Sequence, residues 1–254
     1  MKLARVSSVL LLSCILLSGQ IVLAAGDAPS GNWTGFYAGL HIGNGWGNSD
    51  TNFYPLPDAA TFGISQAKVD LSPSGAVGGL QVGYSYQMGC WVAGIEADFS
   101  GSGISSSKTV SPILDSTGDP IPDGGALTTH HDINWFGTLR PRLGYTIIPT
   151  VLVYGTAGFA YGNVSSSANT DLGPLLPVFY AASSNTTATG WTAGGGIEWA
   201  FSKCWTLKAE YLYIDLGSQS TIANPNLALL PATRVRYTWQ TTAGILNFGV
   251  NYRF

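Results

Sequence analysis

Three histidines and one aspartate are the residues of this chain best suited to acid–base chemistry: His41, His130, His131 and Asp132. A hydrolase needs a nucleophile, a base and an orienting acid within hydrogen-bond reach of one another. No serine of the sequence has a telling spacing to these histidines. We therefore expect no catalytic residues and a protein that is not an enzyme.

The run His130-His131-Asp132 also contains side chains that bind metal ions. Successive residues of a β-strand point to opposite faces, so these three side chains would not converge on one ion. We expect them to be polar residues at the rim of a loop, with no metal site and no cofactor.

Charged side chains inside the regular segments are the next candidates. Charged residues make up 10% of the chain, whereas about a quarter is usual in a soluble domain. The clear mid-strand charges lie on the parity opposite to the apolar residues of their own segment, and they are Glu96, Asp98, Arg140, Arg142, Glu198, Lys208, Glu210 and Arg253. Four acids and four bases on one face can neutralise one another, either as a packed ion-pair lattice or as the lining of a narrow polar conduit.

The segments that carry these charges alternate between apolar and polar residues with period 2, which predicts β-strands. Eight segments show the pattern: 33–46, 74–86, 91–99, 130–145, 151–162, 189–201, 205–214 and 242–254. Three short connections ("QMGC", "TIIPT" and "SKC") alternate with four long polar gaps, at 47–73, 100–129, 163–188 and 215–241. Short turns at one end and long loops at the other are typical of an outer-membrane barrel.

The parity opposite to the charges is apolar and aromatic. In segment 91–99 it consists of Trp91, Ala93, Ile95, Ala97 and Phe99, and in segment 130–145 of Ile133, Trp135, Leu139, Leu143 and Tyr145. Aromatic residues gather at the segment ends, as in the interfacial girdles of membrane barrels. We therefore predict an all-β fold: an eight-stranded antiparallel transmembrane β-barrel with lipid outside, polar groups inside, short periplasmic turns and long extracellular loops.

Side chains roughly fill the interior of an eight-stranded barrel. We therefore favour the ion-pair lattice over the conduit. A structural or surface role in the bacterial envelope follows, with a small passive channel for small solutes as the alternative. Adhesion through the loops is a second alternative, and the turn-rich stretch 111–125 leaves contact with a host or a phage open.

Residues 1–25 have the features of a secretory signal peptide that is removed from the mature protein. Lys2 and Arg5 precede the short apolar core 9–17, and Ala24-Ala25 offers small residues for cleavage. Residues 26–254 then form the barrel domain, with nine basic and 14 acidic residues and a net charge of 9 − 14 = −5. This acidic balance argues against a nucleic-acid-binding surface.

Cys90 and Cys204 remain after removal of the leader, and each directly precedes a tryptophan. The periplasm permits disulfides, but a bridge needs Cα atoms within about 7 Å. In the expected barrel the two turns lie on opposite sides, so we expect free thiols.

Several stretches together resemble one family. They are "WTGFYAGLHIGNGWG" (33–47), "WFGTLRPRLGY" (135–145), "GFAYGNV" (158–164), "GWTAGGGIEWAF" (190–201), "LKAEYLYIDLG" (207–217) and "NFGVNYRF" (247–254). They are similar to the Omp25/Omp31-type outer-membrane β-barrel proteins of α-proteobacteria, which are also labelled porin-family or outer-membrane immunogenic proteins.

The resemblance implies a location in the bacterial outer membrane, among lipids and lipopolysaccharide, and the role of a surface antigen, a structural component, a small pore or an adhesin. It also implies that the barrel-assembly machinery reads the last strand, with Tyr252 and Phe254 as the signal. The last strand would close the barrel against the first. The resemblance assigns no other role to individual residues, and it leaves the oligomeric state open.

Overall fold

The computed structural model describes residues 31–56, 67–115, 117, 119–120, 125–172, 179–226 and 234–254. The expected signal peptide, 1–25, lies outside these residues. The strands are β1 (Gly35–Leu56), β2 (Ala67–Leu71), β3 (Ser74–Met88), β4 (Trp91–Val110), β5 (Ala126–Ile148), β6 (Val151–Asp171), β7 (Phe179–Ala200), β8 (Trp205–Ala223) and β9 (Arg234–Arg253). The described part of the chain contains no helix long and apolar enough to cross a bilayer.

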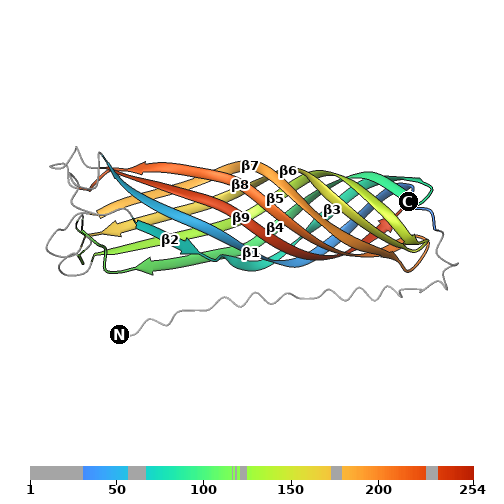
Figure 1. The fold of residues 1–254 in the computed structure, drawn as a ribbon, viewed down its shortest axis with the longest axis horizontal. Coiled ribbons are helices and arrows are strands. Elements are labelled where there is room, and N and C mark those ends of the chain that lie inside the picture. Colours follow the sequence, from blue (N-terminus) through green and yellow to red (C-terminus); the bar gives the residue numbers. More distant parts are fainter. Residues whose placement is uncertain are drawn as a thin grey trace, which may run out of the picture.

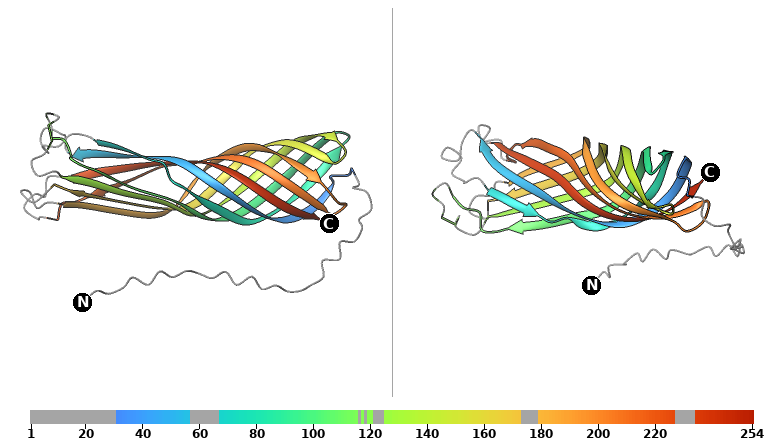
Figure 2. Two further views of the ribbon diagram at one scale, coloured as in Figure 1. Left: turned by 90° about the horizontal axis from the view of Figure 1, so that it is seen from below. Right: turned by 45° about the vertical axis from the view of Figure 1, so that its right-hand side comes forward.

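Eight of these strands form a closed antiparallel ring, which confirms the fold class. The order is β1-β3-β4-β5-β6-β7-β8-β9, and β9 pairs with β1 from Tyr37↔Arg253 to Leu56↔Arg234. Figures 1 and 2 show the long, tilted strands of this cylinder. Closure leaves no free edge in the ring, so every strand of it has two neighbours.

The two ends of the cylinder differ. Three short turns, between β3 and β4, β5 and β6, and β7 and β8, lie with the C-terminus at one end (Figure 1). The strand ends that the longer connections join lie at the other end (Figure 1). Gly89 in the first turn has φ +62°, the left-handed conformation in which glycine is favoured.

Several strands extend much further into the expected long loops than the sequence pattern suggested. β6 ends at Asp171 rather than near 162, and β7 begins at Phe179 rather than near 189. A short additional strand, β2, lies within the expected loop 47–73 and pairs with Ser49–Phe53 of β1. These extensions are rich in Ser, Thr and Asn, so they read as loops. They nevertheless continue the ladder because their inward side chains are buried.

One face assignment was wrong. Ile133 was expected on the lipid face together with Trp135, but Ile133 is 3% exposed and points inward. The register of β5 against β6 shifts between Ile133 and Trp135. A bulge adds one residue to one strand, so the parity of the side chains changes across it.

Candidate functional site: a charged interior beneath two apolar layers

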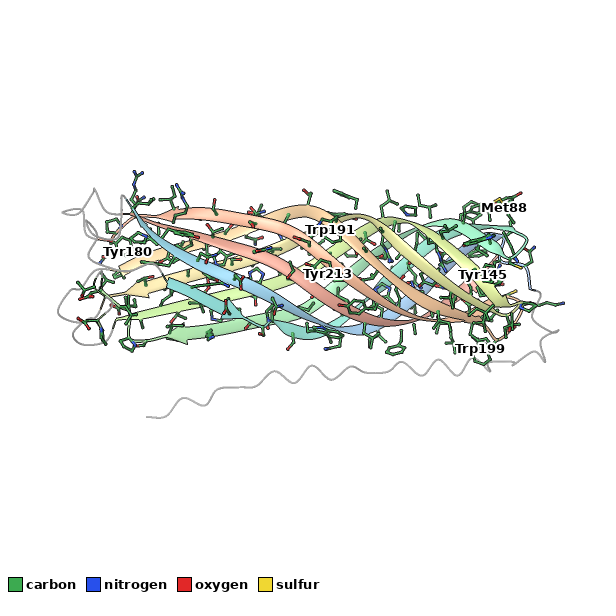
Figure 3. The ribbon with its side chains drawn as sticks, in the orientation of Figure 1. Met88, Tyr145, Tyr180, Trp191, Trp199 and Tyr213 are labelled. Carbon is green, nitrogen blue, oxygen red and sulfur yellow. The ribbon has the colours of Figure 1, made fainter. Side chains whose placement is uncertain are left out.

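Aromatic side chains on the outer surface mark the two edges of a band around the barrel. The band occupies the half of the barrel's length that is nearest the short turns (Figure 3). The aromatic residues bracket single strands at Phe36–Trp46, Trp91–Phe99, Trp135–Tyr145, Trp191–Trp199 and Trp205–Tyr213, which are nine to eleven residues each, counting both ends. A tilted strand crosses a bilayer in about 9–11 residues. In Figure 3 the labelled Trp191 and Tyr213 lie about midway along the barrel, and Trp199 and Tyr145 lie near the short-turn end. The band therefore has the height of a bilayer, and the barrel continues beyond it.

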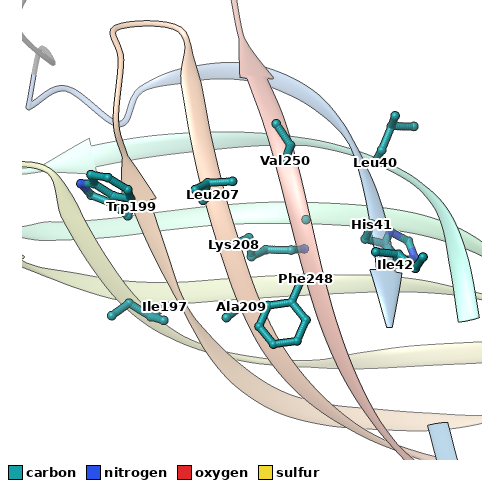
Figure 4. A pocket seen from close by; sticks show the side chains of 11 residues that line it. Leu40, His41, Ile42, Ile197, Trp199, Leu207, Lys208, Ala209, Phe248 and Val250 are labelled. Carbon is teal, nitrogen blue, oxygen red and sulfur yellow. The ribbon is translucent and has the colours of Figure 1, made fainter. Parts of the chain in front are cut away.

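Within this band the outer and inner faces differ in polarity. Figure 4 shows the wall formed by β8, β9 and β1, where apolar and polar side chains alternate. Leu40 and Phe248 are 63% and 55% exposed on the outside, whereas His41 and Lys208 are buried inside. The exposed apolar residues form a shallow groove that faces the expected lipid.

Arg140 on β5 is the centre of the buried charges. Its guanidinium contacts three carboxylates, with Nη2 at 2.8 Å from Oε1 of Glu96 and 2.9 Å from Oδ2 of Asp98, and Nη1 at 3.1 Å from Oε1 of Glu210. Thr138 accepts a hydrogen bond from Nε of Arg140 at 2.8 Å. All five side chains are buried, so the ion pairs lie where water screens them little.

Arg142 extends the cluster toward the short-turn end. Its guanidinium lies 2.6 Å from Oε2 of Glu198 and 3.2 Å from Oε2 of Glu96. Tyr37 donates a hydrogen bond to the same Glu96 oxygen at 2.8 Å. The ring of Tyr154 lies 4.0 Å from the guanidinium carbon. These contacts connect β1, β4, β5, β6 and β7 across the barrel axis.

Lys208 on β8 completes the cluster. Its Nζ is 2.9 Å from Oε1 of Glu96 and 3.6 Å from Oε2 of Glu210, and it donates a hydrogen bond to Gln81 at 2.6 Å. Seven of the eight interior charges therefore form one connected network.

Arg253, the eighth interior charge, lies apart. Among the described residues it donates a hydrogen bond to the carbonyl of Asn32 and stacks on the ring of Trp33 at 4.9 Å. The network thus pairs four carboxylates with three cations, and not with four as the sequence count suggested. Arg253 instead packs at the short-turn end, beside the turn that joins β7 and β8, where its backbone N–H bonds the carbonyl of Cys204.

An apolar layer lies directly beyond the charged network. Its buried members are Val77, Ile104, Ile133, Phe136, Ala160, Val164, Ala188, Ile214, Leu216, Ala243 and Ile245. They come from seven of the eight ring strands, and all are at most 4% exposed. These buried side chains pack together at the level of Trp46, Trp135 and Tyr213, which lie on the outer surface at the end of the band away from the short turns.

A second apolar layer lies near the far end of the barrel. It consists of Phe53, Val69, Ile113, Leu127, Ala168, Leu172, Tyr180, Ala182, Ala223, Val235, Tyr237 and Trp239. Tyr237 and Trp239 stack with ring centroids 5.9 Å apart, and Tyr237 shares a 2.6 Å hydrogen bond with Thr170. Most outward residues of this part are polar, with Tyr54, Phe179 and Ile222 as exposed exceptions, so its polarity is largely the reverse of that in the lipid band.

A thin polar layer separates the two apolar layers. His131 is fully buried there, with Nδ1 at 2.9 Å from Oγ of Ser166 and Nε2 at 3.2 Å from Oγ1 of Thr241. His41 likewise lies 2.8 Å from Oγ of Ser100, at the upper edge of the charged network. Neither His–Ser pair could be predicted from sequence spacing, because the two residues of each pair come from different strands. Neither histidine has a carboxylate partner among the described residues, so neither pair forms a catalytic triad.

The remaining candidates lie on the surface. His130 is exposed and Asp132 half-buried on the outside of β5, while His131 between them points inward, so the three do not converge on one ion. Cys90 and Cys204 lie in different turns of the short-turn end, and both are free.

Acidification is expected to destabilise the protein through His131. Burial lowers the pKa of His131 to about 4, whereas that of an unfolded histidine is about 6.5. Below pH 6.5 the unfolded chain therefore binds a proton that the folded protein excludes, and stability falls as the pH falls. Between pH 7.5 and pH 5 the loss from this one group is about 2 kcal/mol.

Urea unfolding of the reconstituted protein at the two pH values measures this loss. His131→Asn should remove most of the difference between the two pH values, whereas the same change at the exposed neighbour, His130→Asn, should leave it in place. An equal pH dependence of wild type and His131→Asn would contradict the assignment.

Comparison with known proteins gives matches that cover most of the chain. Residues 12–254 match the family model for the "Outer membrane protein beta-barrel domain". The 31 kDa outer-membrane immunogenic protein of Brucella melitensis is 35% identical over 245 residues, which cover 94% of this chain and 93% of that protein. The 22 kDa outer membrane protein of Rhizobium leguminosarum is 29% identical over 75% of this chain and 68% of its own length. The 25 kDa outer-membrane immunogenic protein of Brucella abortus is 27% identical over 89% of this chain and 82% of its own.

Proposed function

The chain belongs to the outer-membrane protein β-barrel family, and from this premise we propose that it is a closed scaffold that presents a surface outside the bacterial outer membrane. It is an integral protein of that membrane, and the apolar outer band of the barrel contacts membrane lipids. The proposal concerns what the barrel does there. It holds a rigid, plugged cylinder in the bilayer, and it carries the part of the barrel away from the short turns, which we call the upper barrel, beyond the membrane.

The observation that carries the proposal is the apolar layer above the charged network. An ion that followed the charged residues from the periplasmic end would meet a packed cluster of apolar side chains such as Phe136, Ile214 and Ile245, each at most 3% exposed. Apolar constrictions exclude ions because they do not hydrate. The inner face of β9 has the same order, from Asn251 and Asn247 to Ile245, and then from Thr241 to Trp239.

Planar-bilayer recording tests the closed scaffold directly. The purified, folded protein is expected to give no stepwise currents at neutral pH, because the interior is packed with ion pairs and apolar side chains. A general porin, reconstituted in the same membrane, serves as the positive control. Reproducible unitary conductance from the wild-type protein would favour the small passive channel, with Glu96, Arg140 and the other interior charges as its lining.

The surface role rests on the relatives and on the outer face of the upper barrel. Two of the relatives carry the word immunogenic in their names, and the strands of this chain beyond the aromatic band present polar side chains to the outside. We propose that this part and its loops are recognised as a surface antigen, and that the loops are the place of any host or phage contact.

Export and assembly are part of the same proposal. Residues 1–25 would direct the chain to the periplasm, and the barrel 26–254 would then insert into the membrane among lipopolysaccharide. Tyr252 and Phe254 point outward, with ring centroids 5.2 Å apart. An outward aromatic pair on the closing strand is accessible to the barrel-assembly machinery, which supports its role as the assembly signal.

A catalytic role has little support. The relatives are named as outer-membrane proteins and not as enzymes. His41 and His131 lie in the packed interior, each beside a serine but without an orienting carboxylate among the described residues.

A further inference from the structure

A polar ledge lies on the outer face of β5, β6 and β7, directly beyond the aromatic band. It is formed by His130, Asp132, Asn134, Asn163, Ser165, Ser167, Ser183 and Asn185. A depression of about 210 Å³ is lined by six of these residues, all except Asn134 and Asn163, together with Ser166 and Ser184. The register places Asp132, Ser165 and Asn185 side by side across the three strands, and His130, Ser167 and Ser183 in the next row. Trp135 and Tyr161 lie below them, with ring centroids 6.1 Å apart.

A hydrogen-bond ladder holds the lower row of the ledge in place. Asn134 donates from Nδ2 to Oδ1 of Asn163 at 2.7 Å and to Oγ of Ser165 at 2.8 Å. Asn163 donates in turn to Oδ1 of Asn185 at 2.8 Å. The amides are therefore pre-oriented on a rigid sheet, and a ligand that binds them does not have to immobilise them.

The chemistry of the ledge selects for hydroxyl groups. It combines a carboxylate, an imidazole, three amides and three serine hydroxyls, which offer both donors and acceptors. The ledge itself contains no lysine or arginine, so it lacks the groups that bind phosphate most strongly. A sugar ring, with neighbouring hydroxyls and an apolar face that can pack on an aromatic ring, fits this arrangement.

The position of the ledge along the strands, relative to the aromatic band, indicates which kind of sugar-bearing molecule it can contact. Asn134 directly precedes Trp135 in the sequence, and Asp132 lies two residues before Asn134 on β5. At about 3.3 Å per residue the lower row lies within about 10 Å of the aromatic band, measured along the strand. This is the zone of the lipid headgroups, since the headgroup regions extend the bilayer from about 30 Å to about 40–45 Å.

We propose that the ledge binds a sugar of the headgroup of an outer-leaflet glycolipid, whose acyl chains run down the apolar outer strands below it. This inference rests on the proposed location of the ledge on the outer side of the membrane and deepens the proposed lipid contact. The ledge thus fixes one face of the barrel to glycolipid, while the rest of the circumference makes general lipid contacts.

Native mass spectrometry of the full barrel measures the retained lipid. The protein is released from vesicles that contain phospholipid and a glycolipid with a dephosphorylated disaccharide headgroup. The double variant Asp132→Ala/Asn163→Ala removes two hydrogen-bonding groups of the ledge. We expect it to retain about tenfold less glycolipid than the wild type, with phospholipid retention unchanged.

The matched control is Ser218→Ala/Gln240→Ala, which removes two outward polar side chains that face each other across β8 and β9. It should retain glycolipid like the wild type. Equal retention by the ledge variant would overturn the proposal, as would binding only of the phosphorylated glycolipid or full displacement by the free disaccharide. Heat-modifiable migration on gels verifies that each variant is folded. Conductance is a separate measurement, so the closed scaffold and the ledge can fail independently.

Discussion

Arg140→Ala is expected to lower the free energy of unfolding by about 3–5 kcal/mol. The guanidinium of Arg140 contacts Glu96, Asp98 and Glu210, and all four side chains are almost fully buried. Its removal leaves three carboxylates with Lys208 and Arg142 as the remaining cations of the network among the described residues. Water cannot replace the lost cation in a packed interior, so the variant would carry uncompensated charge.

Urea unfolding in lipid vesicles, together with heat-modifiable migration on gels, measures this effect. Arg236→Ala is the matched control, because Arg236 is exposed on the outside of β9 beyond the aromatic band. A surface change of this kind is usually within about 0.5 kcal/mol of neutral. If Arg140→Ala unfolds at the same urea concentration as the wild type, the charges do not act as a lattice.

The closed ring and the inward direction of the charges followed from one strong signal in the sequence. The period-2 alternation places each charge of segments 91–99 and 205–214 on the face opposite to its tryptophans, and no other arrangement satisfies both lipid and backbone. Pairing between particular charges did not follow. Which carboxylate Arg140 meets depends on the stagger of strands around the barrel, and sequence alone leaves that stagger open.

The upper barrel was missed because the apolar parity changes along a single strand. In β9 the apolar residues Leu246, Phe248 and Val250 are even-numbered and face outward, whereas Val235 and Tyr237 are odd-numbered and face inward. The strand itself is continuous, so the change marks the point where the exterior passes from lipid to water. A search for apolar residues at every second position ends at that point. It therefore assigns the remaining residues of the strand to a loop.

The parity change also explains why the interior has layers. Inside the lipid band the outer face takes the apolar residues, and the inner face receives the polar and charged ones. Beyond the band the outer face is mostly polar, and the apolar side chains that pack the strands together point inward. Within the lipid band, the sheet therefore has the polarity of a membrane barrel, with apolar residues outside. Beyond the band it has the polarity of a soluble β-protein, with apolar residues inside.

Trp239→Ala is expected to lower the free energy of unfolding by about 3–5 kcal/mol, because this side chain is a fully buried member of the upper apolar layer. Trp239 is 0% exposed and stacks on Tyr237 at 5.9 Å. Its indole Nε1 is buried without a hydrogen-bond partner among the described residues. Trp239→Phe removes that N–H group and keeps most of the ring, so it should cost much less than the alanine variant.

The free energy of unfolding of a variant at a lipid-facing aromatic residue distinguishes packing against lipid from packing inside the upper barrel. Phe248 lies on β9 nine residues beyond Trp239, but it is 55% exposed toward the lipid. In vesicles Phe248→Ala should cost about 1 kcal/mol or less, because lipid chains fill the space that the ring leaves, whereas the cavity at Trp239 stays empty. Equal losses for Trp239→Ala and Phe248→Ala would mean that the upper layer is no more tightly packed than the lipid contact. The barrel beyond the membrane would then have no apolar core of its own, and the plug that the closed scaffold requires would depend on the ion pairs and on the apolar layer directly beyond them.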